Sequence, residues 1–372
     1  MKTRAELAAQ LRSGGVVVVK IGSRLLAEDA EARVAVLAAE ARALADRGVR
    51  AVIVTSGAIA LGVARLGLAE RPRTMPGLQA AAAVGQGRLM QIYERALAGH
   101  GLACGQVLLT HDDVRDRRRY LNARHALGEL LRLGAVPVIN ENDTVSVDEI
   151  KFGDNDRLAA LVTSLVEADA LCILTDVDGL YDGDPAAGAK LIPEVRDIDR
   201  EARPVAGGAR SGVGTGGMAS KVEAARVAGR FGVVTLVASG RRARPITSLV
   251  DGEDAGTVFW PSVSRLQSRK HWIAYALRPS GALVVDAGAR RALTDGKKSL
   301  LPSGVKAVRG RFGQGDAVSV LDEAGEEFAR GLCAFDSDEA EQIAGRRTSE
   351  LEALLGYRAV EEVIHRDDLV LL

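Results

Sequence analysis

The sequence has neither an excess of charge of one sign nor a long uninterrupted apolar stretch. Its 372 residues include 49 Lys and Arg against 49 Asp and Glu, so the whole chain has no electrostatic preference for nucleic acids or membranes. No segment approaches the roughly 18 apolar residues that a membrane-spanning helix needs. Residues 1–12 are polar and lack the apolar core of a signal peptide. We therefore expect a cytoplasmic protein with no membrane contact.

Cysteine is also scarce. There are three cysteines, an odd number, and they lie far apart and without metal-ligand spacing: Cys104, Cys172 and Cys333. The five histidines have no such spacing either, and no Ser-His-Asp arrangement is visible. These patterns predict buried, reduced thiols and no metal site built from protein side chains.

Short apolar runs rich in Val, Ile and Leu recur through the first two thirds of the chain. Continuous runs are typical of strands buried on both faces of a parallel sheet. Helical patterns lie between them, and this alternation predicts a doubly wound, mostly parallel α/β sheet. The predicted strands are 16–21, 51–54, 107–109, 136–139, 170–174 and 233–237, and the predicted helices are 31–47, 78–98, 121–133, 157–167 and 222–229. Ligands of such sheets bind beyond the carboxyl ends of the strands.

The alternation ends near residue 239. Residues 241–278 are predicted to be irregular, and short β-like segments at 282–286 and 317–321 follow, with a final acidic helix. A length of 372 residues suits one large and one small domain. We place the large α/β domain at 1–275 and a small β-rich domain at 281–360.

Small residues follow the first two predicted strands. Lys20 ends the first strand before Gly22 and Ser23, and Ser56 and Gly57 follow the second. Such residues let backbone amides approach phosphate oxygens. The alternatives are a lysine that caps a strand and a tight turn in which Ser56 caps a helix.

Two polar clusters come next. Residues 140–144 follow a strand directly and include Glu141 and Asp143, whose carboxylates can accept hydrogen bonds from an ammonium group. Residues 151–156 open the next helix, where acidic side chains also serve as caps. Two such clusters so close together favour a substrate site over simple capping.

Two further loops indicate a nucleotide. Residues 175–181 follow a strand and hold an Asp-Gly turn, and Tyr181 could flank a flat ring such as adenine. Residues 212–221 are glycine-rich and place Lys221 in a first helical turn, as in a phosphate cradle. The order of residues is not that of a Walker A loop, and the alternative is a flexible surface loop.

These loops, in this order, resemble the amino acid kinase family. The segments that carry the resemblance are 17–22, 54–58, 139–143, 149–156, 174–181 and 212–221. Residues 301–306 and 313–316 resemble a PUA domain, which many bacterial members of this kind carry. The resemblance implies the amino acid kinase fold followed by a C-terminal PUA domain. It also implies phosphorylation of the L-glutamate side-chain carboxylate by ATP and Mg²⁺ to L-glutamyl 5-phosphate, the first step of proline biosynthesis.

The resemblance assigns roles to individual residues. Lys20 and Lys221 would contact the transferred phosphoryl group, and Asp156 would orient the lysines or the substrate. Ser56, Asp143 and Asn155 would bind glutamate. The nucleotide would contact Lys20, Thr175, Asp176, Thr215, Gly216, Gly217, Met218, Ala219, Ser220 and Lys221. One departure is Arg24, where a small residue is expected; it would either alter phosphate contacts or point to solvent.

The sequence also permits other functions. A kinase of the same fold could act on aspartate, acetylglutamate or a nucleoside monophosphate. An RNA-binding protein is the alternative from another class, because PUA domains often bind RNA. Residues 281–372 hold twelve Lys and Arg against seventeen Asp and Glu, a net charge of −5, although a local basic patch includes Lys306 and Arg309. The resemblance further implies feedback inhibition by proline, and we expect a homo-oligomer whose assembly or regulation the PUA domain modulates.

Overall fold

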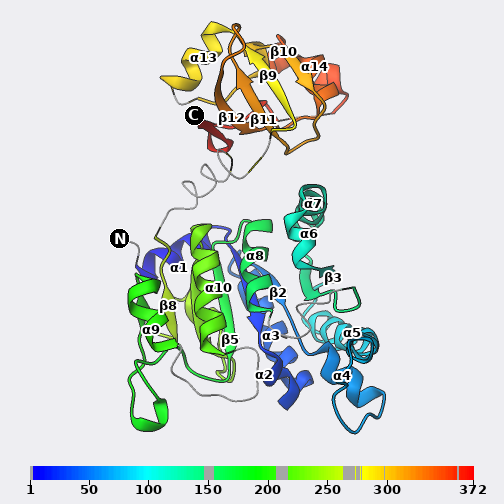
Figure 1. The fold of residues 1–372 in the computed structure, drawn as a ribbon, viewed down its shortest axis with the longest axis vertical. Coiled ribbons are helices and arrows are strands. Elements are labelled where there is room, and N and C mark those ends of the chain that lie inside the picture. Colours follow the sequence, from blue (N-terminus) through cyan, green and yellow to red (C-terminus); the bar gives the residue numbers. More distant parts are fainter. Residues whose placement is uncertain are drawn as a thin grey trace. The chain divides into compact units, whose positions relative to one another are not determined.

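A computed structural model describes residues 3–145, 155–206, 217–262, 273, 277, 279–296, 298–357 and 360–372 (Figure 1). The chain divides into two compact units, Met1–Val263 and Ser264–Leu372. Each unit has its own sheet. The limits 1–275 and 281–360 for the two domains stay a prediction.

The first unit is built on an eight-stranded sheet with the order β3-β4-β2-β1-β5-β7-β8-β6. Its neighbouring strands run parallel except β7 and β8, so the prediction of a mostly parallel α/β sheet is confirmed. Every residue of β1, β4, β5 and β7 is buried, as continuous apolar runs predict. The strands are β1 (Val16–Ile21), β2 (Arg50–Val54), β3 (Cys104–Leu109), β4 (Val136–Glu141), β5 (Ala170–Thr175), β6 (Glu194–Val195), β7 (Val234–Ser239) and β8 (Thr257–Phe259).

Helices cover both faces of this sheet (Figure 1). One hydrophobic cluster joins Leu7 of α1, Val34 of α3 and Leu89 of α5 to Val17 and Val19 of β1. Helices α8 and α10 contact each other and strands β1, β5 and β7. The helices are α1 (Arg4–Arg12), α2 (Ser23–Glu28), α3 (Ala30–Ala45), α4 (Ala58–Arg65), α5 (Met75–Ala98), α6 (His111–Arg115), α7 (Arg117–Arg132), α8 (Asp156–Leu165), α9 (Arg203–Ala206), α10 (Met218–Arg230) and α11 (Thr247–Val250).

Helices α4 and α5 cross with their backbones in contact. A Cβ atom on Gly62 would lie 1.8 Å from the carbonyl oxygen of Ala81, and one on Gly85 would lie 1.7 Å from that of Ala58. Real Cβ atoms do not approach a backbone oxygen so closely, so only glycine fits at either position. The crossing fixes α5 against the helix that directly follows β2.

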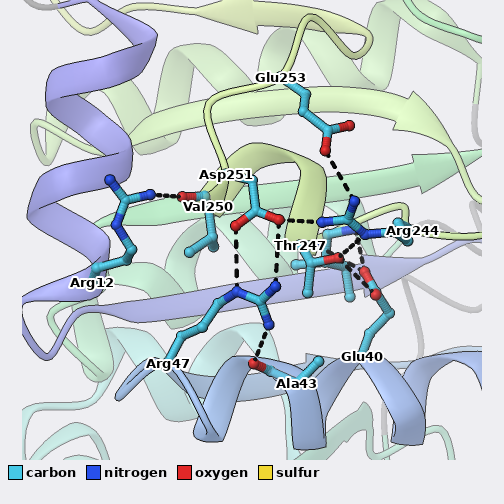
Figure 2. Close-up of polar contacts among 10 residues, drawn as sticks. Arg12, Glu40, Ala43, Arg47, Arg244, Thr247, Val250, Asp251 and Glu253 are labelled. Carbon is cyan, nitrogen blue, oxygen red and sulfur yellow. Dashed lines mark hydrogen bonds and ion pairs between the residues drawn. The ribbon is translucent and has the colours of Figure 1, made fainter.

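A polar network joins α3 to the segment after β7 (Figure 2). The buried Glu40 carboxylate accepts hydrogen bonds from the backbone amide and the hydroxyl of Thr247, at 2.8 and 2.9 Å. Asp251 accepts from Arg47 Nε at 3.3 Å and also pairs with Arg244. Because Thr247 begins α11, Glu40 satisfies backbone groups that a helix start leaves unpaired.

The second unit holds a five-stranded sheet with the order β10-β9-β11-β12-β13. Strands β9 and β11 are parallel and the other pairs are antiparallel. A separate hydrophobic cluster that includes Leu283, Val318 and Phe335 forms its core. The elements are β9 (Gly281–Val285), α13 (Ala287–Thr294), β10 (Val305–Gly310), β11 (Ala317–Leu321), β12 (Glu327–Leu332), α14 (Ser337–Ile343), α15 (Leu351–Leu355) and β13 (Leu369–Leu371). The prediction of a small β-rich C-terminal unit is confirmed.

The stretch 241–278 is less irregular than predicted, because it contains α11 and β8. Both elements are too short, at four and three residues, to produce a periodic pattern. In the part of the chain that the structure describes, no helix has the length and apolarity to cross a bilayer.

Candidate functional site

Three charged side chains meet in the interior of the first unit. Lys20 is the penultimate residue of β1, Asp156 is the first residue of α8, and Lys221 lies in the first turn of α10. Lys20 Nζ contacts Asp156 Oδ1, and Lys221 Nζ lies 3.1 Å from Asp156 Oδ2. The side chains of the three residues are 4%, 0% and 5% exposed. These residues form one buried Lys-Asp-Lys cluster, although Asp156 and Lys221 are 65 positions apart in the sequence.

The cluster has two positive charges and one negative charge. Burial raises the pKa of Asp156, but Lys20 and Lys221 outweigh this effect and hold the pKa below its usual value. The hydroxyl of Ser220 donates to Asp156 Oδ2 at 2.8 Å and further stabilises the carboxylate. The ionised cluster therefore keeps a net charge of +1 where little water screens it, which suits a bound anion.

Polar groups at the ends of β1, β2 and β4 lie beside this cluster. Asn155 Nδ2 donates to the carbonyl oxygen of Thr55 at 2.6 Å and to Asn140 Oδ1 at 2.8 Å. Ser56 Oγ donates to the carbonyl oxygen of Ile21 at 3.1 Å. Ser56 does not cap a helix with its side chain, so the capping alternative for this residue is wrong. Asn155 is the residue directly before α8, and its side chain makes no capping hydrogen bond there. The contacts bring Ser56 and Asn155 to the same edge of the sheet.

Asp143 lies two residues beyond β4 and is partly buried. Burial and the neighbouring Glu141 carboxylate raise the pKa of Asp143 to about 6, against the opposing effect of Arg71. Glu141 itself lies 3.6 Å from His111 Nδ1. A carboxylate destabilised in this way gains from a cation that binds next to it.

Thr175 is the last residue of β5, and Asp176 follows it directly. The hydroxyl of Thr175 donates to Asp176 Oδ1 at 3.1 Å. Arg24 Nη1 lies 3.3 Å from Asp176 Oδ2, and Arg241 Nη1 donates to the Asp176 carbonyl oxygen at 3.1 Å. Arg24, singled out as a departure from the family pattern, therefore pairs with a predicted nucleotide-binding residue, although its side chain is half exposed.

The predicted phosphate-binding stretch is described only in part. Gly217 precedes α10, and Met218, Ala219, Ser220 and Lys221 form its first turn. Thr215 and Gly216 lie outside the described residues, as do residues 151–154 of the second polar cluster. The described part places the start of α10 next to the Lys-Asp-Lys cluster, because Ser220 and Lys221 both contact Asp156, and a helix start suits phosphate oxygens.

One polar side chain at the site was not predicted from the sequence. Gln86, in the middle of α5, accepts a hydrogen bond through its Oε1 from Asn140 Nδ2 at 2.8 Å. The segment around Gln86 is an ordinary helical pattern with no loop motif, so no local signal could have identified it. Asn140 lies in the predicted polar cluster 140–144, but no role was predicted for this residue by itself.

The fold and this site define a doubly wound α/β protein with a buried, positively charged cluster beyond the carboxyl ends of its central strands, between two helix starts. The model of the amino acid kinase family matches residues 15–238, and that of the PUA domain matches residues 281–355. The chain belongs to the amino acid kinase family.

Curated relatives match along nearly the whole chain. Proteins named glutamate 5-kinase from Myxococcus xanthus and Anaeromyxobacter dehalogenans are 54% and 52% identical. The matches cover 97% of both chains for the first and 96% of both for the second. Among solved structures, an N-acetylglutamate synthase from Neisseria gonorrhoeae matches with a TM-score of 0.50 at 19% identity, over 70% of this chain and 62% of that one. This last likeness concerns the fold alone.

Proposed function

We propose that this chain transfers the γ-phosphoryl group of ATP to the side-chain carboxylate of L-glutamate, yielding L-glutamyl 5-phosphate and ADP. This reaction is the first step of proline biosynthesis from glutamate. The observation that carries the proposal is the buried Lys20–Asp156–Lys221 cluster, with Asn155 directly before Asp156. The names of relatives at 50–54% identity support glutamate as the acceptor.

The reaction needs positioning and charge neutralisation more than acid–base chemistry. An oxygen of the glutamate carboxylate attacks the γ-phosphorus, and the bond from that phosphorus to the oxygen of ADP breaks. The acceptor carboxylate is already ionised at neutral pH, so no proton has to leave it. Lys20 and Lys221 neutralise the charge on the transferred group, and Asp156 holds both ammonium groups in place.

The proposed reaction also needs contacts to the nucleotide and a Mg²⁺ ion that accompanies ATP. Thr175, Asp176 and the first turn of α10 contact the nucleotide in this proposal, together with Thr215 and Gly216. Among the described residues, no three His, Cys, Asp or Glu side chains gather closely enough to hold a metal ion. A Mg²⁺ ion carried by the ATP phosphates fits these residues, because phosphates and water supply its oxygen ligands. When bound, the ion neutralises phosphate charge.

Ser56, Asp143 and Asn155 bind glutamate in this proposal. The anionic form of Asp143 accepts hydrogen bonds from the substrate ammonium group. Its pKa of about 6 makes that contact dependent on pH near neutrality. As the pH rises through about 6, Asp143 loses its proton and becomes an acceptor.

The KM for glutamate is therefore expected to fall as the pH rises from about 5 to 7.5. Asp143→Asn removes the titrating group, and its KM for glutamate should be higher by about 10- to 100-fold, the value of a hydrogen bond to a charged group. The measurement is steady-state kinetics of both proteins across this pH range. The KM for ATP serves as the internal control, and an equal pH dependence of the glutamate KM in both proteins would contradict this role of Asp143.

The function itself is tested by measuring ADP release with Mg-ATP and one acceptor at a time. We expect turnover with glutamate and none with aspartate, acetylglutamate or UMP. We also propose that proline suppresses the glutamate reaction. Turnover with a different acceptor alone would retain the kinase and discard glutamate.

We further propose a cytoplasmic homo-oligomer whose assembly or regulation depends on the PUA domain. The net charge of −5 on residues 281–372 argues against RNA as its main partner. A chain that ends at residue 278 should differ from the full chain in oligomeric state or in proline inhibition, as measured by light scattering and kinetics. If both properties are unchanged, the PUA domain has neither role, and RNA binding becomes the reading to test.

A further inference from the structure

Three side-chain amides form a chain of hydrogen bonds beside the Lys-Asp-Lys cluster. Asn155 Nδ2 donates to Asn140 Oδ1 at 2.8 Å, and Asn140 Nδ2 donates to Gln86 Oε1 at 2.8 Å. The chain starts at the carbonyl oxygen of Thr55, which accepts from Asn155 Nδ2 at 2.6 Å. It connects the end of β2, the end of β4, the start of α8 and the middle of α5.

The direction of every hydrogen bond in this chain is set by Thr55. A backbone carbonyl oxygen only accepts, so the atom of Asn155 that faces it must be the nitrogen. That nitrogen uses its two hydrogens on Thr55 and on Asn140, which obliges Asn140 to present its oxygen. The nitrogen of Asn140 then faces Gln86, which must present Oε1. Reversing any one amide would oppose two donors or two acceptors.

These hydrogen-bond directions leave the amide nitrogen of Gln86 as a donor at the end of the chain of amides. Gln86 Nε2 is buried and has no hydrogen-bond partner among the residues that the structure describes. A buried amide nitrogen without an acceptor is destabilising, and such groups in native proteins usually meet a ligand or water. The three residues predicted to bind glutamate belong to the segments that this chain connects. Ser56 follows Thr55, Asp143 follows Asn140 by three residues, and Asn155 is a member of the chain.

We propose that Gln86 is a further substrate-binding residue, whose side-chain amide nitrogen donates to the α-carboxylate of glutamate. The inference rests on the proposed function. An N–H donor suits an anion, whereas the substrate ammonium group needs an acceptor such as Asp143. The reacting carboxylate belongs next to Lys20 and Lys221. Two successive hydrogen bonds separate Gln86 from Asn155, the neighbour of Asp156. We therefore place Gln86 at the end of the substrate away from the reacting carboxylate, next to the α-carboxylate.

Gln86→Glu tests the donor without changing the shape of the side chain. The variant keeps an oxygen for Asn140 but replaces the amide nitrogen by an oxygen that repels a carboxylate. We expect its KM for glutamate to rise at least tenfold at pH 7.5, while its KM for ATP stays within twofold of the unchanged chain. Gln91→Glu is the matched control, because Gln91 lies on the same helix with an exposed side chain. That control should leave both KM values unchanged.

Gln86→Leu covers the case in which a buried carboxylate prevents folding. It removes the donor without adding charge, and its KM for glutamate should also rise severalfold or more. A glutamate KM equal to that of the unchanged chain in whichever variants fold would overturn the assignment of Gln86. If the unchanged chain does not turn over glutamate at all, the proposed function fails, and this inference fails with it. Turnover by the unchanged chain with normal KM values in the variants would refute Gln86 alone.

Discussion

Replacing Asp156 by asparagine is expected to lower kcat for phosphoryl transfer by at least about 100-fold and the free energy of unfolding by about 3–5 kcal/mol. The carboxylate is fully buried and contacts the ammonium groups of Lys20 and Lys221. Without its charge, two buried cations face each other with no counterion. Steady-state kinetics and urea unfolding measure the two effects.

Asp46→Asn is the matched control, because Asp46, directly after α3, pairs with Arg42 of that helix and its side chain is 61% exposed. Exposed pairs of this kind contribute about 0–1 kcal/mol, so both measurements should change little. If Asp156→Asn behaved like this control, the cluster would not be the centre of the site.

The charge state of Asp156 also has a defined pH window. Because its folded-state pKa is depressed, the stability that it contributes is complete above the unfolded value of about 3.9 and is lost as the pH falls through the lower folded value. Between pH 5 and 8, pH changes in activity should thus come from other groups, among which Asp143 is the candidate with a pKa of about 6.

Gly85→Ala is expected to destabilise the first unit by about 3 kcal/mol or more, as severe overpacking does. The added Cβ would lie 1.7 Å from the carbonyl oxygen of Ala58, and backbone cannot move aside as a flexible side chain can. The helices α4 and α5 must then separate. Because α4 follows Ser56 and α5 carries Gln86, a variant that still folds should also have a higher KM for glutamate. Thermal and urea unfolding give the first quantity.

Gly87→Ala provides the comparison two residues further along α5. A Cβ there meets no atom within 4 Å, and the residue is exposed. Alanine favours helix over glycine by about 0.5–1 kcal/mol, so this variant should be slightly more stable than the unchanged chain. A similar loss of stability in both variants would contradict the close approach at the crossing as the reason for the result at Gly85.

Much of the fold could be predicted because its central strands are continuous apolar runs. β1 spans Val16–Ile21 as predicted, and β5 extends the predicted 170–174 by one residue. That Lys20, Asp156 and Lys221 lie close together follows from the rule that residues beyond the carboxyl ends of parallel strands share one edge of the sheet. Their roles in binding and catalysis remain predictions.

What the sequence could not predict depends on contacts between elements that leave no local pattern. Gln86 sits in an ordinary helical segment, and only its hydrogen bond to Asn140 places it at the site. Arg24 pairs with Asp176 across 152 residues, so its partner could not be read from the loop in which it lies. Glu40 is one of several charged residues of α3, and nothing local distinguishes it as the carboxylate that is buried against Thr247.

The position of β1 at the centre of the sheet has a consequence for dynamics. It is hydrogen-bonded to β2 on one side and to β5 on the other, along the whole stretch that leads to Lys20. No fraying of an edge can release this strand, so its amide protons should exchange with solvent only when the whole first unit unfolds. The lysine that faces the phosphoryl group in our proposal is thus carried by a strand that is paired on both sides, and loss of activity in denaturant should coincide with loss of the sheet.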